Sequence, residues 1–152
     1  MKRLIVAGAV ALMCAGGAAG AHEDAMSPAE IVAARQASLM MSGVTMGAIK
    51  AGLDSGAELQ TLGFPTGALA KWAQVLPTMF PAGTGLDSLP DGTRAKAEIW
   101  TDRAGFEARA ADYAAATARL RDAVAAGDAA VAATEWAAVR TTCGSCHDLY
   151  RQ

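Results

Sequence analysis

Helical periodicity is the feature that most limits how this chain can fold. Apolar side chains recur at steps of three and four residues from Ala95 to Ala126, and a second such stripe runs from Ile31 to Ile49. No stretch alternates apolar and polar residues over the length of a strand, and alanine is abundant where β-branched and aromatic residues are scarce. Stripes of this period indicate helices that pack by one face. The sequence therefore predicts an all-α fold.

Local start and stop signals divide the chain into four helices. The first is predicted over residues 27–50 and opens with a capping box, and a shorter second helix is predicted over residues 64–75. A long third helix is expected over residues 95–126, and Asp128 caps the fourth. All connections are short except an irregular loop over residues 81–92, so we expect an antiparallel four-helix bundle.

The first 21 residues are predicted to be a cleaved signal peptide. Lys2 and Arg3 precede a short apolar run, and small residues at 19–21 suit a signal peptidase. The run is too short and glycine-rich for a membrane anchor, so residues 22–152 are expected to be one periplasmic domain. Removal of Lys2 and Arg3 with the signal peptide makes the mature chain more acidic than the formal net charge of −2 of the full sequence. An acidic surface argues against nucleic-acid binding and favours electropositive partners.

The motif that carries the chemistry is Cys143-Gly144-Ser145-Cys146-His147. On a helix, both thiols and the imidazole lie on one face, because steps of three and four residues bring side chains together. Two thiols spaced in this way can bond the vinyl groups of a porphyrin, and the histidine can coordinate its iron. We therefore predict one covalent haem c, with His147 as an axial metal ligand.

Other uses of these cysteines fit less well. A structural zinc site needs four ligands, and the mature chain offers only Cys143, Cys146, His147 and His22. A thioredoxin-type pair begins a helix that follows a strand, and a plain disulfide explains neither the histidine nor the export. The sequence shows no acid–base pair, no nucleophile with a partner histidine and no phosphate loop. The chain is therefore predicted not to be an enzyme.

The composition also leaves room for a flat apolar cofactor. Gly43 and Gly47 lie four residues apart on the first helix, which predicts close approach to another helix or to a flat ligand. Without haem, the bundle is expected to hold a cavity lined by Leu39, Met46, Phe106, Tyr113 and Trp136.

Attachment of haem near the C-terminus of a four-helix bundle resembles the class II cytochromes c, the cytochrome c′ family. The resemblance covers the mature chain. It is strongest at Arg35-Gln36, Leu76-Pro77 with Phe80 and Gly83-Thr84, Glu98-Ile99-Trp100, and Cys143 to Arg151. It implies that Arg35 and Gln36 bind near the haem edge and its propionates, and that Arg151 lies beside the imidazole of His147. Residues 51–64 and 85–97 depart from the family pattern, so no haem contacts are inferred there.

The family has two branches, which differ in the sixth coordination position of the iron. Low-spin members place a methionine there and transfer electrons, whereas high-spin members have an apolar residue and bind small gases such as nitric oxide. An ungapped match puts Leu39 at this position, but a modest helix rotation would present Met40 as a sixth ligand. On base rates, Met40, Met41 and Met46 would instead be core residues.

Electron transfer with redox partner proteins is the expected function, since an open haem still permits it, and gas binding is the alternative. A storage or scaffold role is a third hypothesis, which a covalent haem disfavours. The sequence leaves a homodimer open.

Overall fold

The computed structural model describes residues 25–89 and 91–152, so the predicted signal peptide lies outside the described part of the chain. The described helices are α1 (Pro28–Asp54), η1 (Leu59–Leu62), α2 (Gly63–Val75), η2 (Leu76–Met79), α3 (Glu98–Thr101), α4 (Arg103–Ala125) and α5 (Ala129–Tyr150), where η marks a 3₁₀ helix. Within these residues the extended pairing is an isolated antiparallel bridge between Ala95 and Arg151.

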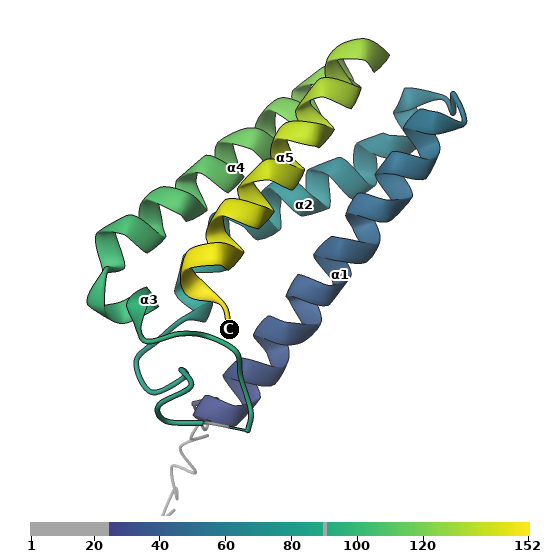
Figure 1. The fold of residues 1–152 in the computed structure, drawn as a ribbon. Helices are drawn as coiled ribbons and strands as arrows, with labels where there is room; N and C mark the ends of the chain where they lie inside the picture. The colour runs from purple at the N-terminus through teal and green to yellow at the C-terminus, as the bar shows by residue number, and fades with distance from the viewer. Residues whose placement is uncertain (1–24, 90) are drawn as a thin grey trace, which may run out of the picture.

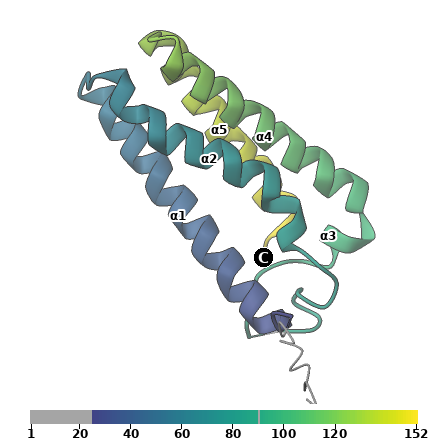
Figure 2. The same ribbon diagram turned by 180° about the vertical axis from the view of Figure 1, so that it is seen from behind.

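The four long helices form an antiparallel bundle, as predicted (Figure 1). The connections between α1 and α2 and between α4 and α5 lie at one end of the bundle, in both the front and the reverse view (Figure 2). The long loop between η2 and α3 closes the other end, where α1 begins and the C-terminus lies. One end of the bundle is thus built from three segments that are distant in sequence.

The predicted helix caps are present. The Ser27 hydroxyl accepts a hydrogen bond from the Glu30 amide, and the Glu30 carboxylate accepts one from the Ser27 amide at 2.8 Å. At the other end of the bundle, Gly127 adopts a φ of +75°, a conformation that favours glycine after a helix. The Asp128 carboxylate then accepts from the Val131 amide at 3.0 Å and caps α5.

The expectation of one helix over residues 95–126 is wrong. The backbone of Asp102, with φ −117° and ψ 54°, separates the short α3 from α4, and its carboxylate accepts from the Gly105 amide at 3.2 Å. Residues 95–97 precede α3 as loop. The apolar stripe continues across the break, so periodicity alone did not reveal it, although Asp102 is a good N-cap residue.

Packing is uneven across the bundle. Helix α4 packs extensively against α2 and α5, whereas α1 makes fewer contacts with its neighbours. The main core includes the fully buried Ile49, Leu120 and Val139. A smaller cluster around Phe106 and Tyr150 lies beneath the long loop. This looser association of α1 leaves space between it and the α4–α5 pair.

In the described part of the chain, no helix combines the length and the apolarity that crossing a membrane requires.

Candidate haem site

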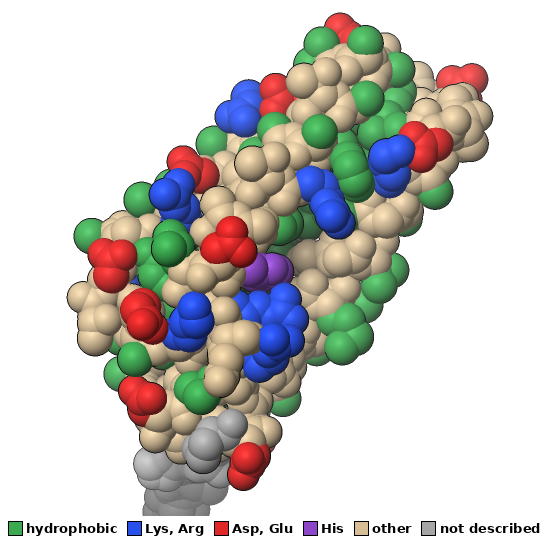
Figure 3. All heavy atoms as spheres, viewed as in Figure 1, with side chains coloured by type: hydrophobic (Ala, Val, Ile, Leu, Met, Phe, Trp, Pro, Cys, Tyr) green, Lys and Arg blue, Asp and Glu red, His purple; other side chains and the backbone are tan. Residues whose placement is uncertain are grey.

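A cavity of about 980 Å³ lies among α1, α4, α5 and the long loop. Its wall includes all five residues expected from the sequence, namely Leu39, Met46, Phe106, Tyr113 and Trp136. The space-filling view shows hydrophobic side chains in the hollow and a histidine at its opening (Figure 3). Burial raises the pKa of the Tyr113 phenol, and a charge on Cys143 acts in the same direction. The interior is therefore suited to a flat, largely apolar molecule.

The three residues of the attachment motif line this cavity from α5. Cys143 and Cys146 are half-buried and are not joined in a disulfide. Burial raises the pKa of each thiol; a charge on Arg140 opposes this at Cys143, and a charge on Cys143 adds to it at Cys146. The neutral form is thus favoured at both positions. Two thiols and an imidazole on one wall of an apolar cavity fit a covalently attached haem.

The imidazole of His147 lies in an environment that favours its neutral form. Partial burial is the main reason that its pKa is lowered; nearby Arg151 and Arg94 act in the same direction, and Asp148 opposes them. The Nη1 atom of Arg151 lies 3.4 Å from Nδ1 of the imidazole, beside which the resemblance placed it. A neutral imidazole keeps a nitrogen lone pair that can bind a metal.

Arg35 is buried on the cavity wall, with 2% of its surface exposed. Its guanidinium donates to the Met79 carbonyl at 3.1 Å, to the hydroxyl and carbonyl of Thr84 at 3.0 and 2.9 Å, and to the Thr93 hydroxyl at 2.9 Å. It also lies 4.3 Å from the centre of the Phe80 ring. Because these partners are all neutral, burial lowers the pKa of Arg35. The arginine ties the long loop to α1.

Gln36 also lines the cavity, and its side-chain amide donates to the Gly92 carbonyl at 2.8 Å. Arg35 and Gln36 therefore lie beside the space for a haem, where the resemblance placed them. The side-chain nitrogen atoms that would donate to propionates, however, donate here to other groups of the protein. Their role in binding propionates stays a prediction.

Three neighbouring side chains of α1 differ in how they meet the cavity. Leu39 and Met40 both line it, with 38% and 70% of their surfaces exposed, whereas Met41 is 60% exposed and lies outside the cavity wall. Met46 is buried. The expectation of a core position is thus met by Met46 and is wrong for Met40 and Met41, whose side chains are exposed.

Among the described residues, no other helix packs against the glycine pair of α1. Apart from the adjoining backbone of α1, an added Cβ at Gly43 or Gly47 would meet no described atom within 4 Å, and both residues are exposed. Both also line the cavity. Of the two explanations that the sequence offered, approach to another helix is wrong, and space for a flat ligand is the one that fits.

Sequence reasoning missed how Trp136 reaches across the cavity. Its indole nitrogen donates to the Met46 carbonyl at 2.9 Å, joining α5 to α1. The ammonium of Lys50 lies 5.6 Å and the guanidinium of Arg140 5.8 Å from the indole ring. The i, i+4 spacing of Trp136 and Arg140 is a signal that could have predicted one of these contacts.

The wall of the cavity is cationic in a chain that is acidic overall. Its charged members are Arg35, Lys50, Asp54, Arg94, Arg109, Arg140 and Arg151. Figure 3 shows Lys and Arg side chains around the histidine. The acidic surface inferred from the net charge is therefore not the surface at the site.

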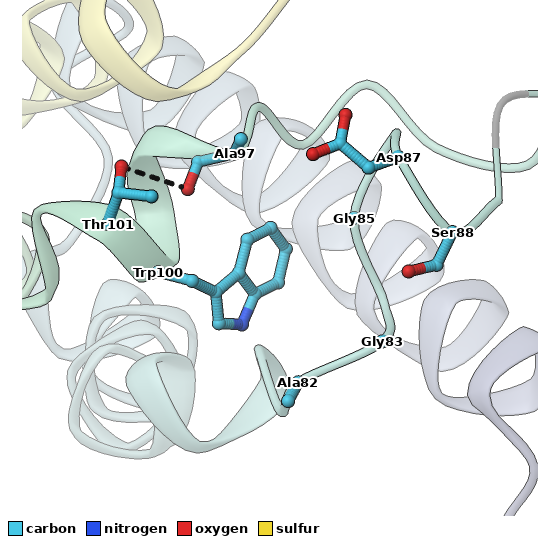
Figure 4. Close-up of a pocket in the computed structure, with 8 residues that line it drawn as sticks. All are labelled: Ala82, Gly83, Gly85, Asp87, Ser88, Ala97, Trp100 and Thr101. Atoms are coloured by element: carbon cyan, nitrogen blue, oxygen red, sulfur yellow. Dashed lines mark hydrogen bonds between the residues drawn. The ribbon is translucent and has the colours of Figure 1, made fainter.

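A second, smaller cavity of about 280 Å³ lies under the long loop (Figure 4). The indole nitrogen of Trp100 donates to the Phe80 carbonyl at 3.2 Å, and the ring packs on Gly85, where a Cβ would collide with it. Asp87 and Ser88 lie at its edge. Since the attachment motif lies on the wall of the larger cavity, that cavity is the candidate site.

Comparison with known proteins agrees with this geometry. The family model described as Cytochrome C′ matches residues 30–151. Cytochrome c′ of Allochromatium vinosum is 29% identical over 154 residues, which cover 99% of each chain. A cytochrome c′ structure described as having an unusual ligand-controlled dimer dissociation superposes with a TM-score of 0.76 and 27% identity, covering 84% of this chain and 98% of the other. A nitric oxide complex of a mutant cytochrome c prime from Alcaligenes xylosoxidans has a TM-score of 0.74 and 23% identity, covering 85% and 99%.

Proposed function

Because the chain belongs to the cytochrome c′ family, whose members carry covalent haem c, we propose that it binds small neutral gases such as nitric oxide at an open haem. The observation that carries the proposal is the position of Leu39 on the inward face of α1. Electron transfer, the function expected from the sequence, becomes the second candidate.

Three residues of α5 would hold the cofactor. Cys143 and Cys146 would form the two thioethers, and His147 would be the axial ligand, because these side chains share the cavity wall. When bound, the haem supplies an iron that can take a gas molecule or exchange an electron. The chain itself supplies the attachment, the neutral imidazole and the apolar surroundings.

The inward face of α1 favours an open site. Val32, Arg35, Met46 and Ile49 are buried, and Leu39 lies on the same line at the cavity, four residues after Arg35 and seven before Met46. Leucine has no atom that can bind a metal. A residue one position further along a helix is rotated by about 100°, which places the more exposed Met40 at the side of this face.

The apolar part of the wall would also select among ligands. Desolvating a charged molecule without a partner is costly, so contact with Leu39, Met46 and Phe106, rather than with the cations of the wall, favours small neutral molecules. Two related structures support this proposal: one is a nitric oxide complex, and the other is described as having a ligand-controlled dimer dissociation.

The second candidate rests on Met40, which lines the same cavity. A rotation of its side chain towards the haem would give the iron a thioether ligand and exclude gases, and the protein would then act in electron transfer with redox partner proteins.

Spectra of three variants separate the two candidates. The oxidised and reduced holoprotein is examined by ultraviolet–visible spectroscopy, with and without carbon monoxide and nitric oxide. We expect a high-spin spectrum, gas binding by the reduced form, faster carbon monoxide binding in Leu39→Ala, and little change in Met40→Ala. Met41→Ala is the matched control, because this neighbouring methionine lies outside the cavity wall.

A low-spin wild type that becomes high-spin and binds carbon monoxide only in Met40→Ala would replace gas binding with electron transfer. A low-spin spectrum that survives both methionine substitutions would contradict both candidates.

The proposal also includes export and assembly. We keep residues 1–21 as a cleaved signal peptide and the periplasm as the location, and assign no catalytic activity. The ligand-controlled dimer described for a related cytochrome c′ supports a homodimer. Mass spectrometry of the isolated protein tests the leader, since an intact Met1 or a lipid on Cys14 would contradict it.

A further inference from the structure

The last turn of α5, which carries His147, is completed by residues from outside that helix. The last four carbonyls of a helix lack partners within it. Here the His147 carbonyl accepts from the Arg151 amide at 3.1 Å, and the Tyr150 carbonyl accepts from the Lys96 amide at 3.0 Å. The Lys96 ammonium reaches the two carbonyls between them at 3.3 and 3.4 Å. One loop lysine therefore serves three of the four terminal carbonyls.

The side chain of Tyr150 ties the same turn to the start of α4. Its hydroxyl donates to the Asp102 carboxylate at 2.8 Å, and that carboxylate also caps α4 through the Gly105 amide at 3.2 Å. The tyrosine ring is buried and packs edge-on against Phe106, with ring centres 5.4 Å apart. A Cβ at Gly105 would collide with Asp102 and approach the Tyr150 hydroxyl. One carboxylate thus holds the end of α5 and the start of α4 together.

The chain beyond α5 is held by the same loop. Ala95 and Arg151 form an antiparallel bridge, and the Gln152 amide donates to the Arg94 carbonyl at 2.9 Å. The hydrogen bonds from Lys96, the bond between Tyr150 and Asp102, and the pairing of residues 151 and 152 with the loop all hold the segment that begins immediately after His147.

We propose that Lys96, Asp102 and Tyr150 form a clamp that positions His147 as the proximal iron ligand. Helix ends fray, and a ligand three residues from the end of a helix would otherwise move with it. Hydrogen bonds outside the ligand set fix the orientation of a metal-binding imidazole and tune the metal. The clamp fixes the last turn at its carbonyls and at its tyrosine, so it sets the geometry and strength of the bond from the imidazole.

The lysine has a second, electrostatic effect. A cation at the C-terminal end of a helix lies at the negative pole of its dipole. The Lys96 ammonium stabilises the last turn in this way and adds to the hydrogen bonds. An arginine at this position would retain both effects, whereas a methionine would keep the length of the stem and lose them.

The test compares Tyr150→Phe, Lys96→Met and Lys96→Arg with the wild-type holoprotein. Glu135→Gln is the matched control, because the Arg119–Glu135 ion pair, at 2.8 Å, also joins α4 to α5 but lies near the other end of both helices. Three quantities are measured: hydrogen exchange of the amides of residues 147–151, the iron–histidine stretching frequency by resonance Raman spectroscopy, and the midpoint potential for reduction of the haem.

Loss of one hydrogen bond should speed amide exchange in the last turn by about five- to tenfold. We expect this change in Tyr150→Phe, together with shifts of the stretching frequency and the midpoint. Lys96→Met should show the same changes to a smaller extent, Lys96→Arg should restore the wild-type values, and Glu135→Gln should change none of them.

Faster exchange with an unchanged stretching frequency and midpoint would overturn the proposal, since the clamp would then be structural only. Unchanged exchange would overturn it as well. If Tyr150→Phe yields no holoprotein, the comparison of Lys96→Met with Lys96→Arg decides. The inference rests on His147 as the iron ligand and not on gas binding, so a protein that binds no gas leaves these readouts intact.

Discussion

Replacing Arg35 by methionine should destabilise the holoprotein strongly, because this buried cation organises the long loop. The substitution keeps an unbranched apolar stem and removes four hydrogen bonds. Two of the four acceptors keep other partners: the Thr84 hydroxyl donates to Pro81 at 2.8 Å, and the Thr93 hydroxyl accepts from Ala95 at 3.2 Å. The carbonyls of Met79 and Thr84 lose their partner.

The magnitude follows from these two carbonyls. A buried acceptor left without a partner costs about 1–3 kcal/mol, so two of them cost about 2–6 kcal/mol. Among the described residues Arg35 forms no ion pair, so removing its buried charge offsets part of this cost. We expect a net loss of about 3 kcal/mol, a large share of the ~5–15 kcal/mol by which a domain is stable.

Urea unfolding of the holoprotein, followed by circular dichroism, measures this loss. Arg35→Lys should cost nearly as much, because an ammonium cannot reproduce a planar fork that bonds several acceptors. Gln36→Ala is the control: it removes one exposed hydrogen bond to the same loop and should cost less than about 1 kcal/mol. If Arg35→Met also costs less than about 1 kcal/mol, the arginine does not hold the loop.

Further outcomes follow from the site. Replacing both Cys143 and Cys146 with alanine should abolish covalent haem; haem that resists acid–acetone extraction from this double variant would contradict the attachment. The apoprotein should lose much of its helical circular dichroism, because the cavity of about 980 Å³ is lined by apolar side chains whose burial is worth ~25 cal/mol per Å²; an unchanged spectrum would refute this. Burial raises the pKa of Tyr113 above its ordinary 10.0, so the unfolded chain loses this proton first and stability falls above pH about 10. Tyr113→Phe should flatten this alkaline loss in urea unfolding, and an identical pH dependence would count against the buried phenol.

Much of the fold was predictable because its signals are local. The capping box at Ser27 and the cap at Asp128 each depend on a few neighbouring residues. The attachment motif is local too, since Cys143, Cys146 and His147 share a helix face by spacing alone. Periodicity also identified the five side chains around the cavity, because it tells which face of each helix turns inward.

Other features depend on segments far apart in the sequence. The break at Asp102 was missed because the apolar stripe continues through it, and the carboxylate there serves Tyr150, 48 residues away. The four acceptors of Arg35 lie at the end of η2 and in the long loop, 44 to 58 residues on. The exposure of Met40 and Met41 depends on which sides of α1 its neighbours leave uncovered.

The sequence by itself determined the four-helix arrangement, the caps at Ser27 and Asp128 and the haem-attachment motif, because each follows from local spacing. Only the tertiary structure decided the break at Asp102, that Met40 and Met41 are exposed, that cations surround the cavity in an acidic chain, and that Lys96 completes the helix of His147. These features depend on how separate segments pack. No local sequence pattern identifies the residues that will pair with a buried guanidinium or with the end of a helix.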